Sequence, residues 1–191
     1  MTQLVNPVLP RGTLNRREQP TIAIDEELTL RPWSGSDVPA LVSAYSDPEI
    51  QRWNLFSCDN TEAEQMIARW TDRWTAETGA DWAIAQMSDD LAIGRVWLRL
   101  IDLHDGEAEI AYWVAPQARG RGSASRAVST LSSWLFDDLG LHRLQLGHSV
   151  HNHVSCRVAT NSGLELEGTR KSALLHADGW HDMHWHAKTA D

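Results

Sequence analysis

Gln117-Ala118-Arg119-Gly120-Arg121-Gly122-Ser123-Ala124 stands between a predicted strand and a predicted long helix. Its two glycines let the backbone approach a ligand without side chains in the way. The first turn of the helix offers unpaired N–H groups at the positive end of the helix dipole. Together these features predict an anion site suited to a pyrophosphate, with Arg119 and Arg121 adding charge at its rim.

Other glycine-rich loops fit this stretch less well. The dinucleotide fingerprint requires G-x-G-x-x-G, and the third glycine is missing here. A Walker loop requires Gly-Lys-Ser/Thr, which is also missing. From the short motif alone, an ordinary turn between a strand and a helix remains the alternative.

Hydrophobic periodicity and turn signals predict the elements on either side of the loop. Strands are predicted over residues 28–33, 81–87, 92–101, 107–114, 144–150, 164–175 and 180–188. Helices are predicted over residues 38–45, 61–77, 123–139 and 154–162, with Asp47-Pro48 breaking the first and Gly79, Gly140 and Gly163 lying past the ends of the others. This order predicts an α/β (α+β) fold with one mixed sheet, partly antiparallel and partly crossed over by helices.

Length and composition narrow the class of protein. The 191 residues favour one domain, which we expect over residues 21–191 after a flexible N-terminal tail at 1–20. The net charge is 17 − 26 = −9, which disfavours nucleic acid as a partner and favours a cationic one such as an amine. Two cysteines are too few for a disulfide framework, and no apolar run is long enough to span a bilayer. We therefore expect a cytoplasmic protein without a membrane partner.

The surroundings of the loop resemble a known family. Ala108-Glu109-Ile110-Ala111-Tyr112-Trp113-Val114, Pro116 and Gln117-x-x-Gly120-x-Gly122 resemble the fourth strand and coenzyme loop of the GNAT superfamily of N-acetyltransferases. Asn152-His153-Val154-Ser155-Cys156-Arg157-Val158 and the hairpin 178–182 are similar to its RimJ/RimL-like branch. The resemblance runs from about residue 28 to 188. It implies a single, mostly antiparallel sheet with helices on both faces, splayed between the fourth and fifth strands.

The resemblance also implies acetyl-CoA as co-substrate and a set of residues that bind it. In the family, backbone groups of the loop and helix start hold the pyrophosphate, while the end of the fourth strand and an asparagine after the fifth strand contact the pantetheine arm. The corresponding residues here are Trp113, Val114, Ala115, Gln117, Arg119, Gly120, Arg121, Gly122, Ser123, Ala124, Asn152 and Ser155.

Direct attack of an amine on the thioester requires a base and an acid. Glu109 matches the position of the family's glutamate base; alternatively it only pairs with a basic neighbour or a backbone group. The tyrosine that many members use as acid falls at Ala159, so this sequence departs from that pattern. By resemblance to the RimL-like branch we expect Ser155 to be the acid or a thiolate hydrogen-bond donor; alternatively its hydroxyl only satisfies backbone groups at a helix start. Tyr112 is a weaker candidate for the acid. A backbone N–H near Val114 is expected to stabilise the oxyanion.

Several histidines and tryptophans leave alternatives open. His184 and His186 share one side of the last predicted strand, near His181 and His176, but no cysteine or carboxylate completes a familiar metal-ligand spacing. We therefore expect no metal site and interpret these histidines as a polar face near the acceptor pocket, with a proton relay as the alternative. Trp53, Trp70 and Trp74 are expected either to pack in the core or to hold a cationic acceptor.

The resulting hypothesis is an acetyl-CoA-dependent N-acetyltransferase acting on the N-terminal amine of a protein or peptide. One alternative is a small-molecule amine as acceptor, such as an antibiotic, a polyamine or an amino-acid derivative. Another is a non-catalytic acyl-CoA-binding sensor module. Relatives often dimerise, so a homodimer is a further expectation.

Overall fold

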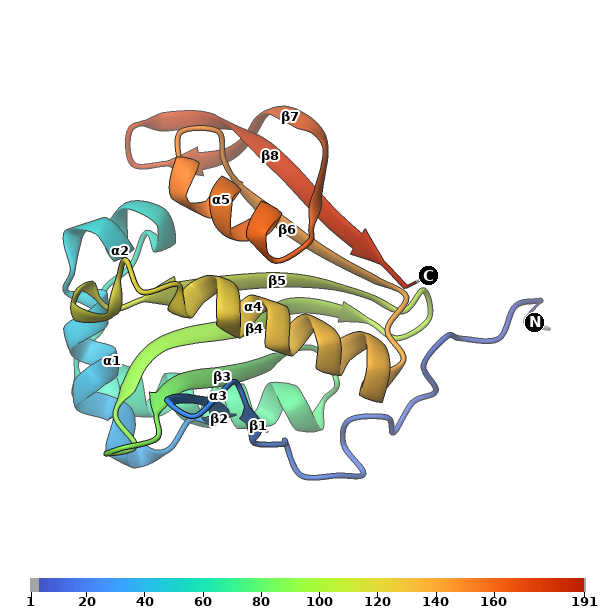
Figure 1. The fold of residues 1–191 in the computed structure, drawn as a ribbon, viewed down its shortest axis with the longest axis horizontal. Coiled ribbons are helices and arrows are strands. Elements are labelled where there is room, and N and C mark those ends of the chain that lie inside the picture. The colour runs from blue at the N-terminus through green and yellow to red at the C-terminus, as the bar shows by residue number, and fades with distance from the viewer. Residues whose placement is uncertain (1–3, 191) are drawn as a thin grey trace.

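A computed structural model describes residues 4–190 as one eight-stranded sheet with helices on both faces (Figure 1). The strands are β1 (Ile22–Ala23), β2 (Leu28–Pro32), β3 (Ala80–Gln86), β4 (Ala92–Asp102), β5 (Glu107–Val114), β6 (Arg143–Ser149), β7 (Glu165–His176) and β8 (Gly179–Thr189). The α-helices are α1 (Val38–Tyr45), α2 (Pro48–Asn54), α3 (Asn60–Thr75), α4 (Ser123–Ser133) and α5 (His153–Asn161). The predicted helix 123–139 continues beyond α4 as a wider π-helical segment, Trp134–Leu139, which ends at Gly140 in the left-handed conformation.

The sheet has the strand order β1-β2-β3-β4-β5-β6-β8-β7. All neighbouring strands are antiparallel except β5 and β6, which are parallel. The expectation of a mixed, mostly antiparallel sheet is therefore confirmed.

The two parallel strands separate after three residues. Pairing of β5 with β6 covers Glu107 to Glu109 on one strand and Arg143 to Gln145 on the other. Beyond this point β5 runs on to Val114 and β6 to Ser149, each still paired with its antiparallel neighbour. The expected splay between the fourth and fifth predicted strands is thus present, and it leaves a wedge bordered by two strand edges.

Asp47-Pro48 starts a helix as well as ending one. The carboxylate of Asp47 accepts a hydrogen bond from the N–H of Ile50 at 3.0 Å, and Pro48 occupies the first helical position. These are favourable residues for a helix start, so the seven-residue helix α2 forms where the sequence analysis expected only a break. No helix between residues 4 and 190 is both long and apolar enough to cross a membrane.

Two apolar clusters hold the layers together. One lies between the sheet and α4 and includes Leu131 and Leu135, together with Leu144 and Leu146 of β6. The other lies between the sheet and helices α1 to α3 and includes Trp70 and, from β5, Trp113. Because side chains alternate along a strand, Glu109 and Ala111 share the face of Trp113. The sheet thus has an α4 face and an α1–α3 face.

The N-terminal segment differs from the expected flexible tail. Leu9 and Leu14 are 4% and 1% exposed and belong to the core. The carboxylate of Glu77, which follows α3, accepts hydrogen bonds from the backbone N–H groups of Gly12 and Leu14. The indole N–H groups of Trp74 and Trp82 donate to backbone carbonyls of residues 17 and 20. The polar, aperiodic sequence obscured these contacts because two leucines and the backbone make them; residues 1–3 lie outside the described residues.

Candidate active site

The edge of β5 offers free backbone groups to the wedge. The N–H of Ala115 donates to the carbonyl of Ile93 on β4. Backbone groups alternate in direction along a strand, so the N–H groups of Val114 and Tyr112 point away from β4 and toward β6. These groups lie beyond the last β5–β6 pair, where a ligand chain can take the place of the missing strand partner.

The loop that follows β5 is shaped by its two glycines. Gly120 and Gly122 have φ angles of 75° and 72°, in the left-handed region where side chains are disfavoured. Gly122 immediately precedes α4, and no side chain among residues 4–190 caps this helix start. The first N–H groups of α4, at Ser123 and Ala124, therefore stand at the positive end of an eleven-residue helix. This arrangement suits an anionic ligand, as the sequence predicted.

Arg119 has partners other than a ligand. Its backbone N–H donates to the carbonyl of Pro116, its Nε donates to the carbonyl of Val114, and its guanidinium pairs with Asp47 at the start of α2. The sequence analysis expected the backbone N–H of Arg119 to bind the pyrophosphate, but this group already donates a hydrogen bond within the protein. The side chain of Arg119 links the loop to α2. Gln117 and Arg121 are exposed on the same loop.

Glu109 lies on the last paired rung before the wedge. It is 8% exposed, and its Oε1 accepts a hydrogen bond from Arg99 of β4 at 3.0 Å. The sequence analysis gave two interpretations of this residue, a base or a partner of a basic neighbour. The ion pair with Arg99 agrees with the interpretation of Glu109 as the partner of a basic neighbour. To act as the base, Glu109 would have to accept a proton while it is paired with Arg99.

Ser155 and Tyr112 come together across the wedge. The hydroxyl of Tyr112, on β5, donates to Oγ of Ser155, on α5, at 2.9 Å. The N–H of Ser155 donates to the side chain of Asn152, which caps α5. Burial raises the pKa of Tyr112 to about 12, against the opposing effect of its hydrogen bond with Ser155. Tyr112 thus stays protonated at neutral pH, and Ser155 keeps its own hydrogen free for another acceptor.

A second chain of polar groups lies near the end of β6. Oγ of Ser149 is 2.8 Å from Nδ1 of His181, and Nε2 of His181 is 2.8 Å from a carboxylate oxygen of Asp178. A carboxylate only accepts, so Nε2 carries the hydrogen and Nδ1 presents its lone pair to the Ser149 hydroxyl. Trp53 of α2 packs edge-on against His181 and His176. By strand alternation Ser149 shares the α1–α3 face with Glu109.

The tryptophans of α3 are core residues. Trp70 and Trp74 are buried, and Trp70 stacks on the guanidinium of Arg95, which lies 3.9 Å from its ring centroid. The cation that Trp70 holds is therefore the protein's own. Of the three tryptophans considered as cation holders, only Trp53, which is half-buried on α2, lies beside candidate site residues.

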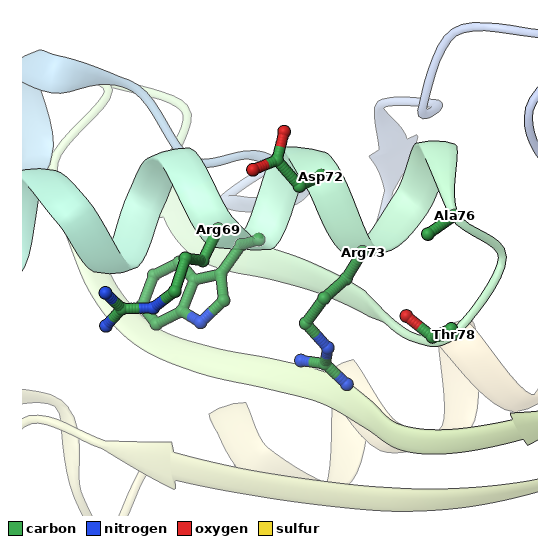
Figure 2. Close-up of a pocket in the computed structure, with 6 residues that line it drawn as sticks. Arg69, Asp72, Arg73, Ala76 and Thr78 are labelled. Atoms are coloured by element: carbon green, nitrogen blue, oxygen red, sulfur yellow. The ribbon is translucent and has the colours of Figure 1, made fainter.

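A hollow of about 340 Å³ lies along α3, lined by Arg69, Trp70, Asp72, Arg73, Ala76 and Thr78 (Figure 2). Arg73 extends from the helix toward the sheet, where it pairs with Asp81 at 2.7 Å and donates to the carbonyls of Leu98 and Arg99. Arg73 therefore belongs to an internal network. None of the residues predicted to bind acetyl-CoA or to act as base or acid lines this hollow.

Comparisons with known proteins identify the family of this chain. The acetyltransferase (GNAT) domain family matches residues 27–165, more than half of the chain. The chain belongs to the GNAT acetyltransferase family. It is therefore an acyltransferase, and GNAT acetyltransferases use acetyl-CoA.

Individual GNAT relatives cover most of the chain. An uncharacterised N-acetyltransferase of Bacillus licheniformis, p20, is 29% identical over 75% of this chain and 82% of its own. A putative ribosomal N-acetyltransferase of Bacillus subtilis, YdaF, is 25% identical over 85% and 91%. Among solved structures, the ribosomal α-N-protein acetyltransferase RimL in complex with coenzyme A superimposes with a TM-score of 0.83 at 21% identity, over 90% of this chain and 99% of that one. The predicted RimJ/RimL-like branch is supported by these relatives.

The sequence analysis of this GNAT enzyme did not predict which side chains contact its candidate residues. Arg99 was not connected with Glu109, and Tyr112 was not connected with Ser155. Asp178 and His181 are three residues apart at a predicted hairpin, which was a usable signal for their contact. Ser149 comes from a different strand, and no local pattern links it to the hairpin.

Proposed function

We propose that this protein transfers the acetyl group of acetyl-CoA to the N-terminal amine of a protein or peptide. One observation carries the proposal: the uncapped start of α4 adjoins the free edge of β5, at the wedge spanned by Tyr112 and Ser155. An anion site beside an open strand edge matches a ligand with a diphosphate and a long amide-containing arm. The ribosomal enzymes among the relatives support a protein amine as acceptor, and the charge of −9 supports a cationic one.

In the proposed complex, the N–H groups of Ser123 and Ala124 bind the pyrophosphate. The N–H of Val114 points into the wedge, where it can donate to the thioester carbonyl oxygen and stabilise the negative charge that develops there. Asn152, at the start of α5, borders the same wedge. Holding donor and acceptor side by side supplies much of the acceleration, since no enzyme-bound acyl group is needed.

Ser155 is the proposed proton donor to the departing thiolate. Its Oγ accepts the hydrogen of Tyr112, so its own hydrogen is directed elsewhere. When Ser155 gives that hydrogen away, Tyr112 can replace it. The two hydroxyls then act together as the acid: Ser155 protonates the thiolate, and Tyr112 returns a proton to Ser155.

Two groups on the α1–α3 face are candidates for the base. Glu109 is buried at the apex of the wedge, and we propose it as the group that accepts the proton of the amine, directly or through water. The chain Ser149–His181–Asp178 is the second candidate, because Nδ1 of His181 can accept a proton through the Ser149 hydroxyl.

The acceptor class is tested by thiol release from acetyl-CoA with a panel of peptides and small amines. We expect peptides with free N-termini to be acetylated and N-terminally blocked versions of the same peptides to be inert. Turnover only with small amines would contradict the peptide assignment. Saturable acetyl-CoA binding without thiol release for any amine would indicate a sensor module instead.

The base is tested by comparing Glu109→Gln with His181→Gln. If Glu109 is the base, Glu109→Gln lowers kcat about 100-fold or more, leaves the Kd of acetyl-CoA unchanged and removes the fall of kcat at low pH. His181→Gln then reduces kcat only slightly. The reverse pattern would assign the proton to His181 and leave the acetyl-transfer proposal intact.

A further inference from the structure

Four potential metal ligands meet beneath α5. They are His148 of β6, Cys156 of α5, and His184 and His186 of β8. One ligand atom from each residue lies within 4.8 Å of the corresponding atom of every other. The register pairs His148 with His184 directly and Leu146 with His186, so these histidines share the sheet face of Leu146, opposite to Glu109. The cluster is therefore separate from the proposed base and from the Ser149–His181–Asp178 chain.

The hydrogen bonds of two histidines fix which nitrogens carry hydrogen. Nδ1 of His148 is 2.8 Å from the carbonyl of Ser149, and Nδ1 of His186 is 3.3 Å from the carbonyl of Leu164. A carbonyl only accepts, so both Nδ1 atoms are protonated and both neutral rings present an Nε2 lone pair. These two Nε2 atoms face each other at 3.2 Å. Two lone pairs at this distance repel each other unless a cation lies between them.

The spacing of the two nitrogens suits a metal ion. Imidazole nitrogens bind Zn²⁺ at about 2.0–2.1 Å in tetrahedral sites, which places two of them about 3.3 Å apart. A backbone carbonyl that accepts the hydrogen on the other ring nitrogen is the usual outer partner of a metal-bound histidine. His148 and His186 thus already have the orientation and the second contacts of ligands.

The other two residues complete a tetrahedral set. His184 has a buried Nδ1 to which no residue between 4 and 190 offers a hydrogen bond. Cys156 is a half-buried free thiol one residue after Ser155. Three imidazoles and one thiolate form a Cys-His₃ set, whose nitrogen and sulfur ligands favour Zn²⁺ over Mg²⁺ or Ca²⁺. The widest separations must shorten by about 1 Å to close around the ion.

We propose that His148, Cys156, His184 and His186 bind one Zn²⁺ ion in a structural site. The ion would fasten α5 to β6 and β8. Asn152 and Ser155 lie at the start of the same helix, so the site would hold the proposed acid in place. The binding of the ion itself does not depend on the proposed acetyl transfer.

Cobalt titration tests the site on the full-length protein, purified without a histidine tag and treated with a chelator. We expect one equivalent of Co²⁺ to produce the visible bands of a tetrahedral ion and a near-ultraviolet sulfur-to-cobalt band, both displaced by one equivalent of Zn²⁺. Cys156→Ser should lose the sulfur band, and His186→Gln should weaken Co²⁺ binding at least 10-fold. Cys58→Ser and His104→Gln are the matched controls outside the cluster, and both should bind as the unmodified protein does.

A second measurement covers the case in which the cluster variants fail to fold. The chain has two cysteines, and a thiol reagent can count those that react in the unmodified protein. Zn²⁺ should protect one thiol, assigned by mass spectrometry to Cys156, and a chelator should restore its reactivity. Equal reactivity of Cys156 with and without Zn²⁺, or tetrahedral cobalt bands that survive in Cys156→Ser with the sulfur band intact, would overturn the proposal. The short Nε2–Nε2 contact would then be explained by a shared proton.

Discussion

Gly122 illustrates how one residue can set the chemistry of a helix start. It is the N-cap residue of α4, with a φ of 72°, and because it has no side chain it leaves the first N–H groups of the helix uncapped. An alanine Cβ would meet no described atom within 4 Å, so the cost of Gly122→Ala comes from backbone conformation rather than from crowding.

Gly122→Ala should therefore weaken acetyl-CoA binding while the protein stays folded. We expect a loss of affinity of at least about 10-fold in calorimetry and a stability loss of about 1–2 kcal/mol, because the left-handed conformation is unfavourable for alanine. Gly168→Ala is the matched control, since it adds a Cβ in open space at a glycine without positive φ. An unchanged Kd for Gly122→Ala would contradict the assignment of the loop.

Tyr112 is the second residue whose behaviour can be measured directly. Because burial raises its pKa to about 12, the folded protein holds the phenol proton from pH 10 to 12 while the unfolded chain releases it. The contribution of Tyr112 to stability is therefore fully present below pH 10 and falls as the pH rises toward 12. Ultraviolet titration of the protein and of Tyr112→Phe should differ by one phenol that ionises near pH 12. A midpoint near pH 10 for the difference between the two titration curves would show that Tyr112 is not buried as described.

At the scale of elements, the N-terminal segment and α3 depend on each other. Burial opposes ionisation of Glu77, but hydrogen bonds from the backbone N–H groups of Gly12, Leu14 and Asn15 outweigh it and lower the pKa of Glu77 below its usual value. Glu77 itself has a φ of 59°, in the left-handed region. It therefore forms the turn that ends α3, where the sequence analysis had placed Gly79. A single side chain therefore links the end of a helix to a segment without regular structure.

Glu77→Gln should loosen residues 4–20 while leaving the sheet intact. A lowered folded pKa means that the stabilisation is present above the unfolded pKa and is lost as the pH falls through the folded value. At neutral pH we expect hydrogen exchange at residues 8–14 to be faster in the variant than in the unmodified protein. In the unmodified protein, the protection of these residues should be lost only when the pH falls below the usual pKa of a glutamate carboxyl group. Equal protection of this segment in both proteins at neutral pH would mean that the leucines alone hold it.

At the scale of the whole molecule, a buried ionic network joins the α1–α3 layer to the sheet. Asp81 of β3 pairs with Arg95 of β4 and with Arg73 of α3, and Arg95 also donates to the hydroxyl of Tyr45 of α1. The rings of Trp70 and Trp97 lie against the Arg95 guanidinium. The indole N–H of Trp113 on β5 donates to the same Tyr45 hydroxyl, so the network joins helices α1 and α3 to three neighbouring strands.

Removing the negative charge of Asp81, at the centre of this network, should lower the free energy of unfolding of the whole protein. Asp81→Asn leaves two guanidinium groups without their buried partner, so we expect a loss of about 3–5 kcal/mol in chemical denaturation. Asp90→Asn is the matched control: Asp90 also pairs with an arginine, Arg31, but is 70% exposed, so its loss should stay below about 1 kcal/mol. Similar losses in the two variants would contradict the central role of Asp81.

Local patterns in the sequence determined the elements and the glycine-rich loop before α4. Apolar spacing, turn residues and glycines act over a few neighbouring positions, so α3, β5 and the start of α4 were predictable, and so were Gly120 and Gly122. The open wedge followed from the family resemblance. The short helix α2 and the packing of Leu9 and Leu14 were missed because their signals are weak within a short window.

Only the tertiary structure decided which side chains meet. Glu109 with Arg99, Tyr112 with Ser155, and His148 with Cys156 and His186 come from different elements, and their proximity depends on strand register and helix docking. Periodicity specifies the face on which a residue lies, but it does not specify the partner on the opposing element. The long-range contacts that set those partners form only when the layers pack together.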